Sequence, residues 1–372
     1  MFFLKSWKNL FLTKKIIKQI FLYIGMFLIT DLIYSNIFHK KNIKYNCINH
    51  TGIYHYLEKN CTATEKYVKQ TKSYKVYTDE NGFRFSGKKK SKVKKDNIIF
   101  LGDSFTYGMG LSYEKTFVGL LEEEKNNYNF YNLGVPGYSP TMYLYQLKEL
   151  LKNNIKPTKI FLTLDISDVK DEASKWRIDK NKTHPVYIFE KKIEKGDKNS
   201  SFKRKNFKGS RLIARGINNF FRNVKLTYLN KRKDLVVDPG QTVRGSFLYL
   251  DISKTKQSLW RPVSFKGSIK KIKKNITEIA EISKKINAEL YIITYPWPDT
   301  LYHGTKKFDW EKFASDACDK SECKKLINLF PEFKKFKSNN LNWYYDLYIG
   351  NDLHISEQGQ KIIADKLLLE AF

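Results

Sequence analysis

The sequence predicts an α/β fold, a three-layer α/β/α, flavodoxin-like arrangement around a parallel sheet, preceded by one N-terminal transmembrane helix. Apolar runs such as Ile98–Leu101 recur along the chain, and most are followed by a segment with helical periodicity. Runs that are apolar throughout favour strands buried on both faces, and their alternation with helices predicts βαβ units. Ser104, which closely follows the first run, therefore falls at the carboxyl edge of the sheet, where ligands bind in open α/β sheets.

The transmembrane helix is predicted within residues 1–46. The first thirty residues contain five lysines and no acid, and residues 16–38 are mostly apolar. This stretch is long enough to cross the ~30 Å hydrocarbon core, and no small-residue cleavage site follows it, which favours an uncleaved anchor over a signal peptide. The positive charge favours a cytoplasmic stub, so the rest of the chain is predicted to be extracytoplasmic, either periplasmic or at the cell surface. A surface helix of the domain is the alternative.

Residues 47–95 are predicted to form an extracytoplasmic preamble ahead of the main domain, residues 96–372. Asn81 and Gly82 lie between β-prone residues, which favours a tight hairpin turn. We expect this hairpin to pin one edge of the domain.

The four cysteines fall into two sequence-local pairs. Local pairs are typical of disulfides in an oxidising compartment, whereas buried reduced thiols are the alternative interpretation. Zinc is disfavoured because no CxxC spacing is present. The pairs are Cys47 with Cys61 and Cys318 with Cys323.

The main domain is predicted to contain an insertion at about residues 170–261. Apolar positions between residues 212 and 224 recur at helical spacing among basic residues, which favours an amphipathic helix that either packs on the core or docks on a membrane. The other elements are expected at residues 114–125 (helix), 128–133 (strand), 140–153 (helix), 159–164 (strand), 268–285 (helix), 289–294 (strand), 318–329 (helix) and 360–370 (helix).

The formal net charge of +30 bears on the choice of partner. Lysine and arginine supply the phosphate contacts of nucleic-acid binding, but here the lysines are spread over every segment and no nucleic-acid-binding motif is present. We therefore expect no nucleic-acid partner, and favour an anionic membrane surface or an acidic glycan as the electrostatic partner.

Four blocks of polar and glycine residues follow one another along this α/β pattern. They are Gly102-Asp103-Ser104, residues 132–139, residues 165–168 and Asp352-Leu353-His354. Together they resemble the SGNH/GDSL hydrolase superfamily over about residues 76–372. The resemblance implies a serine hydrolase or O-acyltransferase-like protein with no cofactor and no metal, whose family-defining residues are Ser, Gly, Asn and His.

The resemblance assigns the catalytic residues. Ser104 corresponds to the nucleophile, which needs a base within hydrogen-bond reach to remove its proton. His354, just before the last helix, corresponds to that base. The family's orienting aspartate commonly lies three residues before the histidine, where this chain has Asn351. We expect Asp352, the nearest carboxylate, to orient His354 instead.

The resemblance also implies an oxyanion hole with three donors. Two correspond to the backbone amides of Ser104 and Gly137. The third, an asparagine side chain in the family, corresponds to Ser167 here. Because loss of one such donor typically costs ~10²–10³ in rate, we expect either that Ser167 acts through a water or that the activity is weak. Asp103 is interpreted as an orienting or structural residue.

Three functions follow from these residues. The first is a serine esterase that removes acyl groups, with acetyl preferred, from a cell-envelope glycan through a Ser-His-Asp acyl-enzyme. The second is an O-acyltransferase that moves an acetyl group onto a polysaccharide and needs a multi-span membrane partner as acyl donor. The third is a catalytically degenerate domain that binds an anionic polymer.

Overall fold

The computed structural model describes most of the main domain, most of the preamble and the N-terminal helix. The described residues are 2–37, 46–51, 54–67, 72–88, 96–178, 185–187, 213, 217, 265–304, 308–349 and 352–372.

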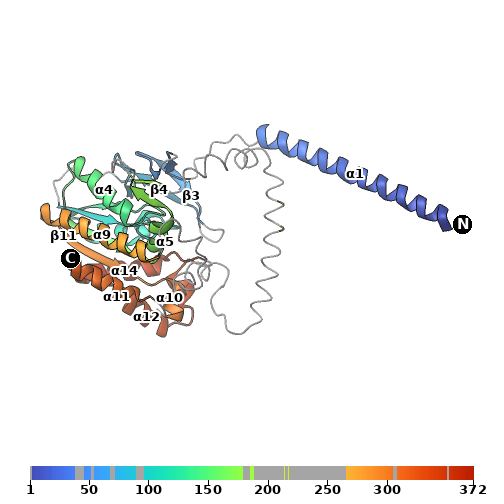
Figure 1. Ribbon diagram of the computed structural model, residues 1–372. Coiled ribbons are helices and arrows are strands. Elements are labelled where there is room, and N and C mark those ends of the chain that lie inside the picture. The colour runs from blue at the N-terminus through green and yellow to red at the C-terminus, as the bar shows by residue number, and fades with distance from the viewer. Residues whose placement is uncertain are drawn as a thin grey trace. The chain divides into compact units, whose positions relative to one another are not determined.

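An eight-stranded sheet organises the described part of the domain (Figure 1). Its order is β12-β11-β8-β6-β7-β5-β4-β3; the five strands from β12 to β7 are parallel, and β5, β4 and β3 continue the sheet antiparallel. The predicted α/β class with a parallel sheet is therefore confirmed. The strands are β3 (Thr62–Glu65), β4 (Tyr74–Thr78), β5 (Arg84–Phe85), β6 (Asp96–Leu101), β7 (Tyr128–Asn132), β8 (Pro157–Leu164), β11 (Glu289–Thr294) and β12 (Lys325–Asn328).

Helices form two layers over this sheet. From β6 to β7 the chain steps toward one edge of the sheet, and from β7 to β8 it steps back toward the other edge. Because both crossovers are right-handed, α3 in the first and α4 in the second lie on opposite faces of the sheet. α3 contacts α14, whereas α4, α5 and α11 all contact α9. The larger helices are α3 (Phe117–Glu124), α4 (Pro140–Lys152), α5 (Ser167–Ser174), α9 (Phe265–Lys285), α11 (Trp310–Ser321) and α14 (Glu357–Ala371).

Short elements complete the domain. They are β1 (Ile48–His50), β2 (His55–Leu57), α2 (Ser104–Tyr107), the 3-10 helix η1 (Tyr113–Lys115), β9 (Trp176–Ile178), β10 (Pro185–Tyr187), α10 (Pro298–His303), α12 (Phe330–Ser338) and α13 (Trp343–Leu347).

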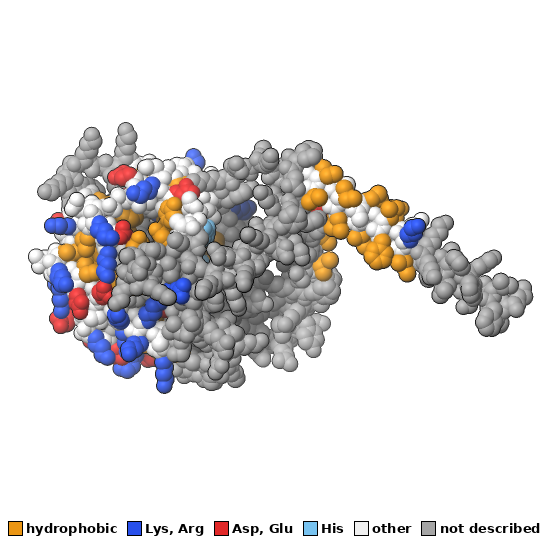
Figure 2. Space-filling model, turned by 45° about the horizontal axis from the view of Figure 1, so that its top comes forward, with side chains coloured by type: hydrophobic (Ala, Val, Ile, Leu, Met, Phe, Trp, Pro, Cys, Tyr) orange, Lys and Arg blue, Asp and Glu red, His pale blue; other side chains and the backbone are white. Residues whose placement is uncertain are grey.

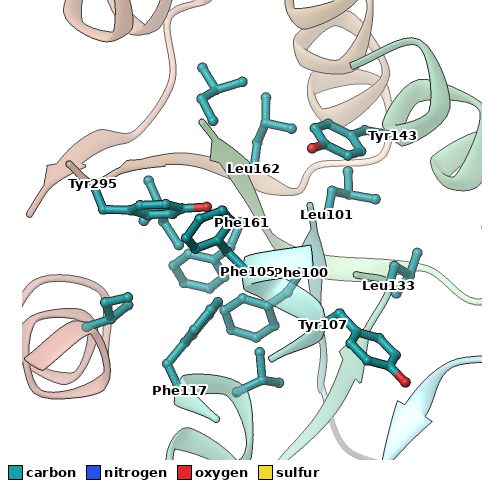
Figure 3. Packing of buried hydrophobic residues seen from close by; sticks show 14 of the residues in the cluster. Phe100, Leu101, Phe105, Tyr107, Phe117, Leu133, Tyr143, Phe161, Leu162 and Tyr295 are labelled. Carbon is teal, nitrogen blue, oxygen red and sulfur yellow. The ribbon is translucent and has the colours of Figure 1, made fainter. Parts of the chain in front are cut away.

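Aromatic residues form the core beneath the carboxyl edge of the sheet (Figure 3). Phe100 of β6 stacks on Phe161 of β8 with ring centroids 4.8 Å apart, and the Phe117 ring from α3 packs edge-on against the Phe100 ring. Phe105 of α2 lies on Tyr295 after β11, with centroids 4.9 Å apart. The apolar residues of β6 are fully buried, so the strand that leads to Ser104 is held on both faces.

One expected element is wrong. Residues 318–329 were predicted as a helix, but α11 ends at Ser321, where Glu322 adopts a left-handed φ of 51°. Leu326 and Ile327 then pair with β11 as the parallel strand β12. A short apolar run does not by itself distinguish a strand from a helix, and the neighbouring strand decides the outcome here.

The preamble belongs to the same sheet as the domain. The predicted hairpin at Asn81 and Gly82 joins β4 to β5, and β5 pairs with β7 through Arg84 and Asn132. Both cysteine pairs are disulfide-bonded.

The N-terminal helix α1 (Phe2–Ile37) contains the segment Ile16–Tyr34, which has a mean hydropathy of 1.8 and is long enough to cross a membrane. The large apolar side chains of this segment are exposed (Figure 2). This length and composition fit either a membrane anchor or a signal sequence.

The start of the predicted insertion packs on the domain, because α5 and β9 contact α9 and α4, respectively. The predicted basic helix between residues 212 and 224 lies outside the described residues, except that Ile213 and Ile217 are helical and exposed.

Candidate active site

Ser104 lies at the turn between a buried strand and a short helix. β6 ends at Leu101, and Ser104 is the first residue of α2, whose N-cap Asp103 accepts a hydrogen bond from Phe105 N at 2.9 Å. The first N–H groups of a helix have no intrahelical partner. The Ser104 N–H is therefore a backbone donor beside its own hydroxyl.

His354 and Asp352 meet Ser104 from a loop 250 residues further along the chain. His354 Nε2 lies 2.8 Å from Ser104 Oγ, and His354 Nδ1 lies 2.5 Å from Asp352 Oδ1. A carboxylate only accepts hydrogen bonds, so Nδ1 carries the proton and Nε2 is left to accept the Ser104 hydroxyl proton. The structure thus brings together the three residues predicted as catalytic.

Local contacts hold the His354 loop. Asp352 Oδ1 also accepts from the backbone N–H of His354 at 2.9 Å, and Ile349 N donates to His354 O at 2.8 Å. The Phe105 ring stacks on the imidazole with centroids 4.8 Å apart. These contacts fix both the position and the plane of the imidazole.

Tyr67 adds a contact that the sequence interpretation missed. Its hydroxyl donates to Asp352 Oδ2 at 3.0 Å, and its oxygen lies 2.9 Å from His354 Nδ1. Tyr67 comes from the preamble, and no local pattern marks it among the many tyrosines of this chain. The other candidate for the orienting residue, Asn351, lies outside the described residues.

The surroundings of Asp352 favour its charged form. Burial acts to raise the pKa of this carboxyl, but the hydrogen bonds and charge of His354 and the Tyr67 hydroxyl outweigh burial and lower the pKa below its usual value. Burial, and then the charge of Asp352, raises the pKa of Tyr67. Tyr67 therefore remains a hydrogen-bond donor at neutral pH.

Gly137 lies on the loop after β7, the strand next to β6. Its φ of +80° favours glycine, and a Cβ there would lie 3.1 Å from Lys175 Nζ. His55 Nε2 contacts Pro136 O at 2.7 Å, and Trp176 Nε1 donates to Gly137 O at 3.1 Å. The Gly137 N–H has no hydrogen-bond partner among the described residues.

Ser167 lies close to the candidate nucleophile, but its hydroxyl donates to the carboxyl group of Asp103. Ser167 Oγ and Ser104 Oγ each lie 3.4 Å from Asp103 Oδ2. Ser167 is the first residue of α5, and its backbone N–H donates to Asp165 Oδ1. At the position predicted for the third oxyanion donor, the chain therefore has a serine hydroxyl that donates to Asp103, as the Ser104 hydroxyl also does.

Buried carboxyl groups surround this side of the site. Burial raises the pKa of Asp103 well above its usual value, and the charge of Asp165 adds to the rise. Burial likewise raises the pKa of Asp165, although it accepts a hydrogen bond from Trp297 Nε1 at 2.7 Å. Burial raises the pKa of Asp171 to about 6 despite its ion pair with Lys175.

The preamble also holds the segment that follows Ser104. The buried Arg84 guanidinium donates to three backbone carbonyls, those of Tyr107, Gly108 and Leu111. Glu65 Oε1 accepts from the Tyr107 hydroxyl at 3.0 Å. The preamble therefore supports α2 and the following turn as well as the His354 loop.

This arrangement suits nucleophilic acyl chemistry. A serine hydroxyl, an imidazole and a carboxylate lie in a hydrogen-bonded series, and two backbone N–H groups are candidates to stabilise an oxyanion. Within the described residues, no group of three His, Cys, Asp or Glu side chains is placed to hold a metal ion.

Several solved structures are similar to this chain at low identity. A member of the lipolytic protein G-D-S-L family from Veillonella parvula is 13% identical over 74% of this chain and 97% of that chain, with a TM-score of 0.40. The acetylxylan esterase Axe2 from Geobacillus stearothermophilus is 11% identical over 76% and 97%, with a TM-score of 0.40. The esterase EstA from a Pseudoalteromonas species is 14% identical over 74% and 95%, with a TM-score of 0.37.

No curated protein matches this chain. A family model does match residues 54–289, a span that includes Ser104, Gly137 and Ser167. The chain belongs to the family described as "Protein of unknown function (DUF1574)".

Proposed function

We propose that this protein is a membrane-anchored serine esterase that removes acyl groups, acetyl in particular, from a cell-envelope glycan. The observation that carries the proposal is the hydrogen-bonded series from Ser104 through His354 to Asp352, with contacts of 2.8 and 2.5 Å. A hydroxyl, a base and an orienting carboxylate at these distances are what an acyl-enzyme mechanism requires.

In this mechanism Ser104 Oγ attacks the carbonyl carbon of the ester while His354 Nε2 takes its proton. The tetrahedral oxyanion accepts hydrogen bonds from the N–H groups of Ser104 and Gly137. The ester bond then breaks, and His354 gives the proton to the departing sugar oxygen. Water, deprotonated by His354, attacks the acyl-enzyme and releases the carboxylic acid, and the proton returns to Ser104.

Asp352 and Tyr67 act on His354 rather than on the substrate. Asp352 holds the tautomer with the proton on Nδ1 and stabilises the imidazolium that forms. Tyr67 is a positioning residue, because its hydroxyl donates a hydrogen bond to Asp352 Oδ2 while His354 contacts Oδ1.

Labelling of Ser104 tests the proposal. The full-length protein in detergent is treated with a fluorophosphonate, and the modified residue is located by mass spectrometry. We expect stoichiometric labelling at Ser104 and none in the Ser104→Ala variant. Absence of labelling together with absence of acetate release from acetylated xylan would refute the enzymatic function.

Product analysis separates hydrolysis from acyl transfer. With 4-nitrophenyl acetate and an oligosaccharide acceptor, the proposal predicts free acetate as the acetyl product. Acetyl groups recovered mainly on the oligosaccharide would instead establish the O-acyltransferase that the sequence left as the alternative.

The proposed location outside the cytoplasm rests on two observations. The chain contains a helix long enough to anchor it, and both cysteine pairs form disulfides, which persist in oxidising compartments. A reporter enzyme fused after Phe372 is expected to be active outside the cytoplasm, and activity confined to the cytoplasm would contradict this orientation.

A further inference from the structure

A cavity lies on the α4 side of the Gly137 loop. Its volume is about 510 Å³, within the range of small-molecule clefts. Tyr54 and Tyr56 at β2 line it from the preamble, Phe83 lines it from the β4–β5 turn, and Tyr145 lines it from α4. None of these residues belongs to the candidate active site.

The lining combines aromatic rings with free amides. The Tyr54 ring centroid lies 5.9 Å from that of Tyr56 and 6.1 Å from that of Tyr145, so three phenol rings form one wall. The side-chain amides of Asn81 and Asn153 have no hydrogen-bond partner among the described residues. Aromatic faces accept apolar C–H surfaces, and amides both donate and accept hydrogen bonds.

The charge of the cavity narrows the ligand class. The whole chain carries a formal charge of +30, but the lining contains one lysine, Lys59, against two glutamates, Glu58 and Glu149. Glu149 is paired with Lys152 at 2.6 Å. An anionic polymer requires a positive lining, and an acyl chain would gain nothing from the amides. A neutral sugar has C–H faces and a rim of hydroxyl groups, which match the rings and the amides.

The cavity is connected to the candidate active site through one loop. Val135 and Tyr138, on either side of Pro136 and Gly137, line the cavity. The Tyr138 hydroxyl donates to His55 O at 2.5 Å, and His55 Nε2 contacts Pro136 O. A ligand in the cavity therefore rests against the loop that carries the candidate oxyanion donor.

We propose that this cavity is a binding subsite for neutral sugar units of the glycan that carries the ester. The subsite rests on the proposed esterase function for its biological role, because it would hold an unreacted part of the polymer while an esterified unit reaches Ser104. Its ability to bind sugars does not depend on catalysis.

Binding to an inactive protein tests the subsite. The full-length Ser104→Ala variant in detergent is titrated with cellotetraose, xylotetraose and chitotetraose, and binding is followed by saturation-transfer NMR and calorimetry. We expect at least one of these neutral oligosaccharides to bind with a Kd of roughly millimolar or tighter. Adding Tyr145→Ala or Asn153→Ala to this variant is expected to weaken that binding about tenfold or more.

Matched variants control for damage to the fold. Asn153 is exposed, so its truncation removes an amide without opening the core, and Tyr345→Ala removes an exposed tyrosine outside the cavity. Tyr345→Ala is expected to leave sugar binding unchanged. Thermal unfolding of each variant verifies that it is folded.

Two results would overturn the subsite. One is no binding of any of the three oligosaccharides, and the other is binding that both Tyr145→Ala and Asn153→Ala leave unchanged. Neither result bears on the labelling of Ser104, so labelled Ser104 without sugar binding refutes only the subsite. Sugar binding by a protein that shows neither labelling of Ser104 nor acetate release refutes only the esterase.

Discussion

Two carboxyl groups, those of Asp352 and Asp103, lie near the Ser104 hydroxyl group, and their surroundings favour opposite charge states. Asp352 is linked to Ser104 through His354 and accepts hydrogen bonds from His354 and Tyr67, which lower its pKa. Asp103 is fully enclosed beside Asp165, and burial raises its pKa well above the usual value. A charge beside the imidazole stabilises the imidazolium, whereas a charge beside the oxyanion would oppose it.

The difference shows that the position of a carboxyl group in the chain does not determine its role. Asp103 adjoins the candidate nucleophile in sequence, but burial disfavours its charged form. Asp352 is far away in sequence, but the mechanism requires its charge. The following experiments, ordered by expected effect, test this contrast.

Removing the charge of Asp352 is expected to have the largest effect. Asp352→Asn keeps the shape of the side chain but favours the wrong imidazole tautomer, so we expect kcat to fall about 10³- to 10⁴-fold. Initial rates with 4-nitrophenyl acetate measure this loss. Asn351→Ala is the matched control and should change kcat less than about threefold; a larger loss for Asn351→Ala than for Asp352→Asn would reverse the assignment.

The stability of two variants should depend on pH with opposite signs. The pKa of Asp171 is raised from 3.8 to about 6 in the folded state, so its contribution to stability is lost as pH rises through 6. The pKa of Asp352 is lowered, so its contribution is present above about 4 and is lost as pH falls through the folded-state value.

Urea unfolding from pH 3 to pH 7 therefore separates the two carboxyls. Relative to the unmutated protein, Asp171→Asn should gain up to roughly 3 kcal/mol between pH 4 and pH 7, whereas Asp352→Asn should lose stability as pH rises from 3 to about 4 and then show no further change. Slopes of the same sign would contradict the contrast.

Tyr67→Phe is expected to have an intermediate effect. The variant keeps the ring but removes the hydroxyl that donates to Asp352 Oδ2, so we expect kcat to fall about tenfold with little change in KM. In urea unfolding, the loss of stability at acidic pH should also begin at a higher pH, because Asp352 loses a group that lowers its pKa. Tyr344→Phe, which removes a donor to the backbone oxygen of Asp352, is the control; an unchanged acidic loss of stability in Tyr67→Phe would assign Tyr67 a packing role only.

Asp103→Asn should have the smallest effect. Asparagine resembles a protonated aspartate and is also a good N-cap, so we expect kcat within about threefold of the unmutated protein. Asp103→Ala removes the cap of α2 and should cost about 1 kcal/mol of stability, measured by urea unfolding. A loss in Asp103→Asn as large as that in Asp352→Asn would show that both carboxyl groups must be charged.

Local patterns were sufficient to predict much of the fold. β6, β7, β8 and β11 begin within two residues of their predicted starts and end within one residue of their predicted ends. For β6, β8 and β11 the reason is that a buried parallel strand is largely a continuous apolar run. α4 begins at Pro140, as predicted, since proline suits the first helical turn. β12 was missed because a four-residue strand has no distinctive period, and its pairing with β11 is a long-range contact.

The sequence by itself determined the α/β class, and it placed Ser104, Gly137 and Ser167 after successive predicted strands, since glycines and polar residues after strands mark the ends that meet at one edge. His354 was assigned from the resemblance to SGNH/GDSL hydrolases. Only the tertiary structure decided what surrounds these residues. It brought Tyr67 from the preamble to Asp352, turned Ser167 toward Asp103 and enclosed Asp103 beside Asp165. Hydrogen-bond partners and burial set the charge state of a carboxyl group, and both depend on segments that are distant in sequence.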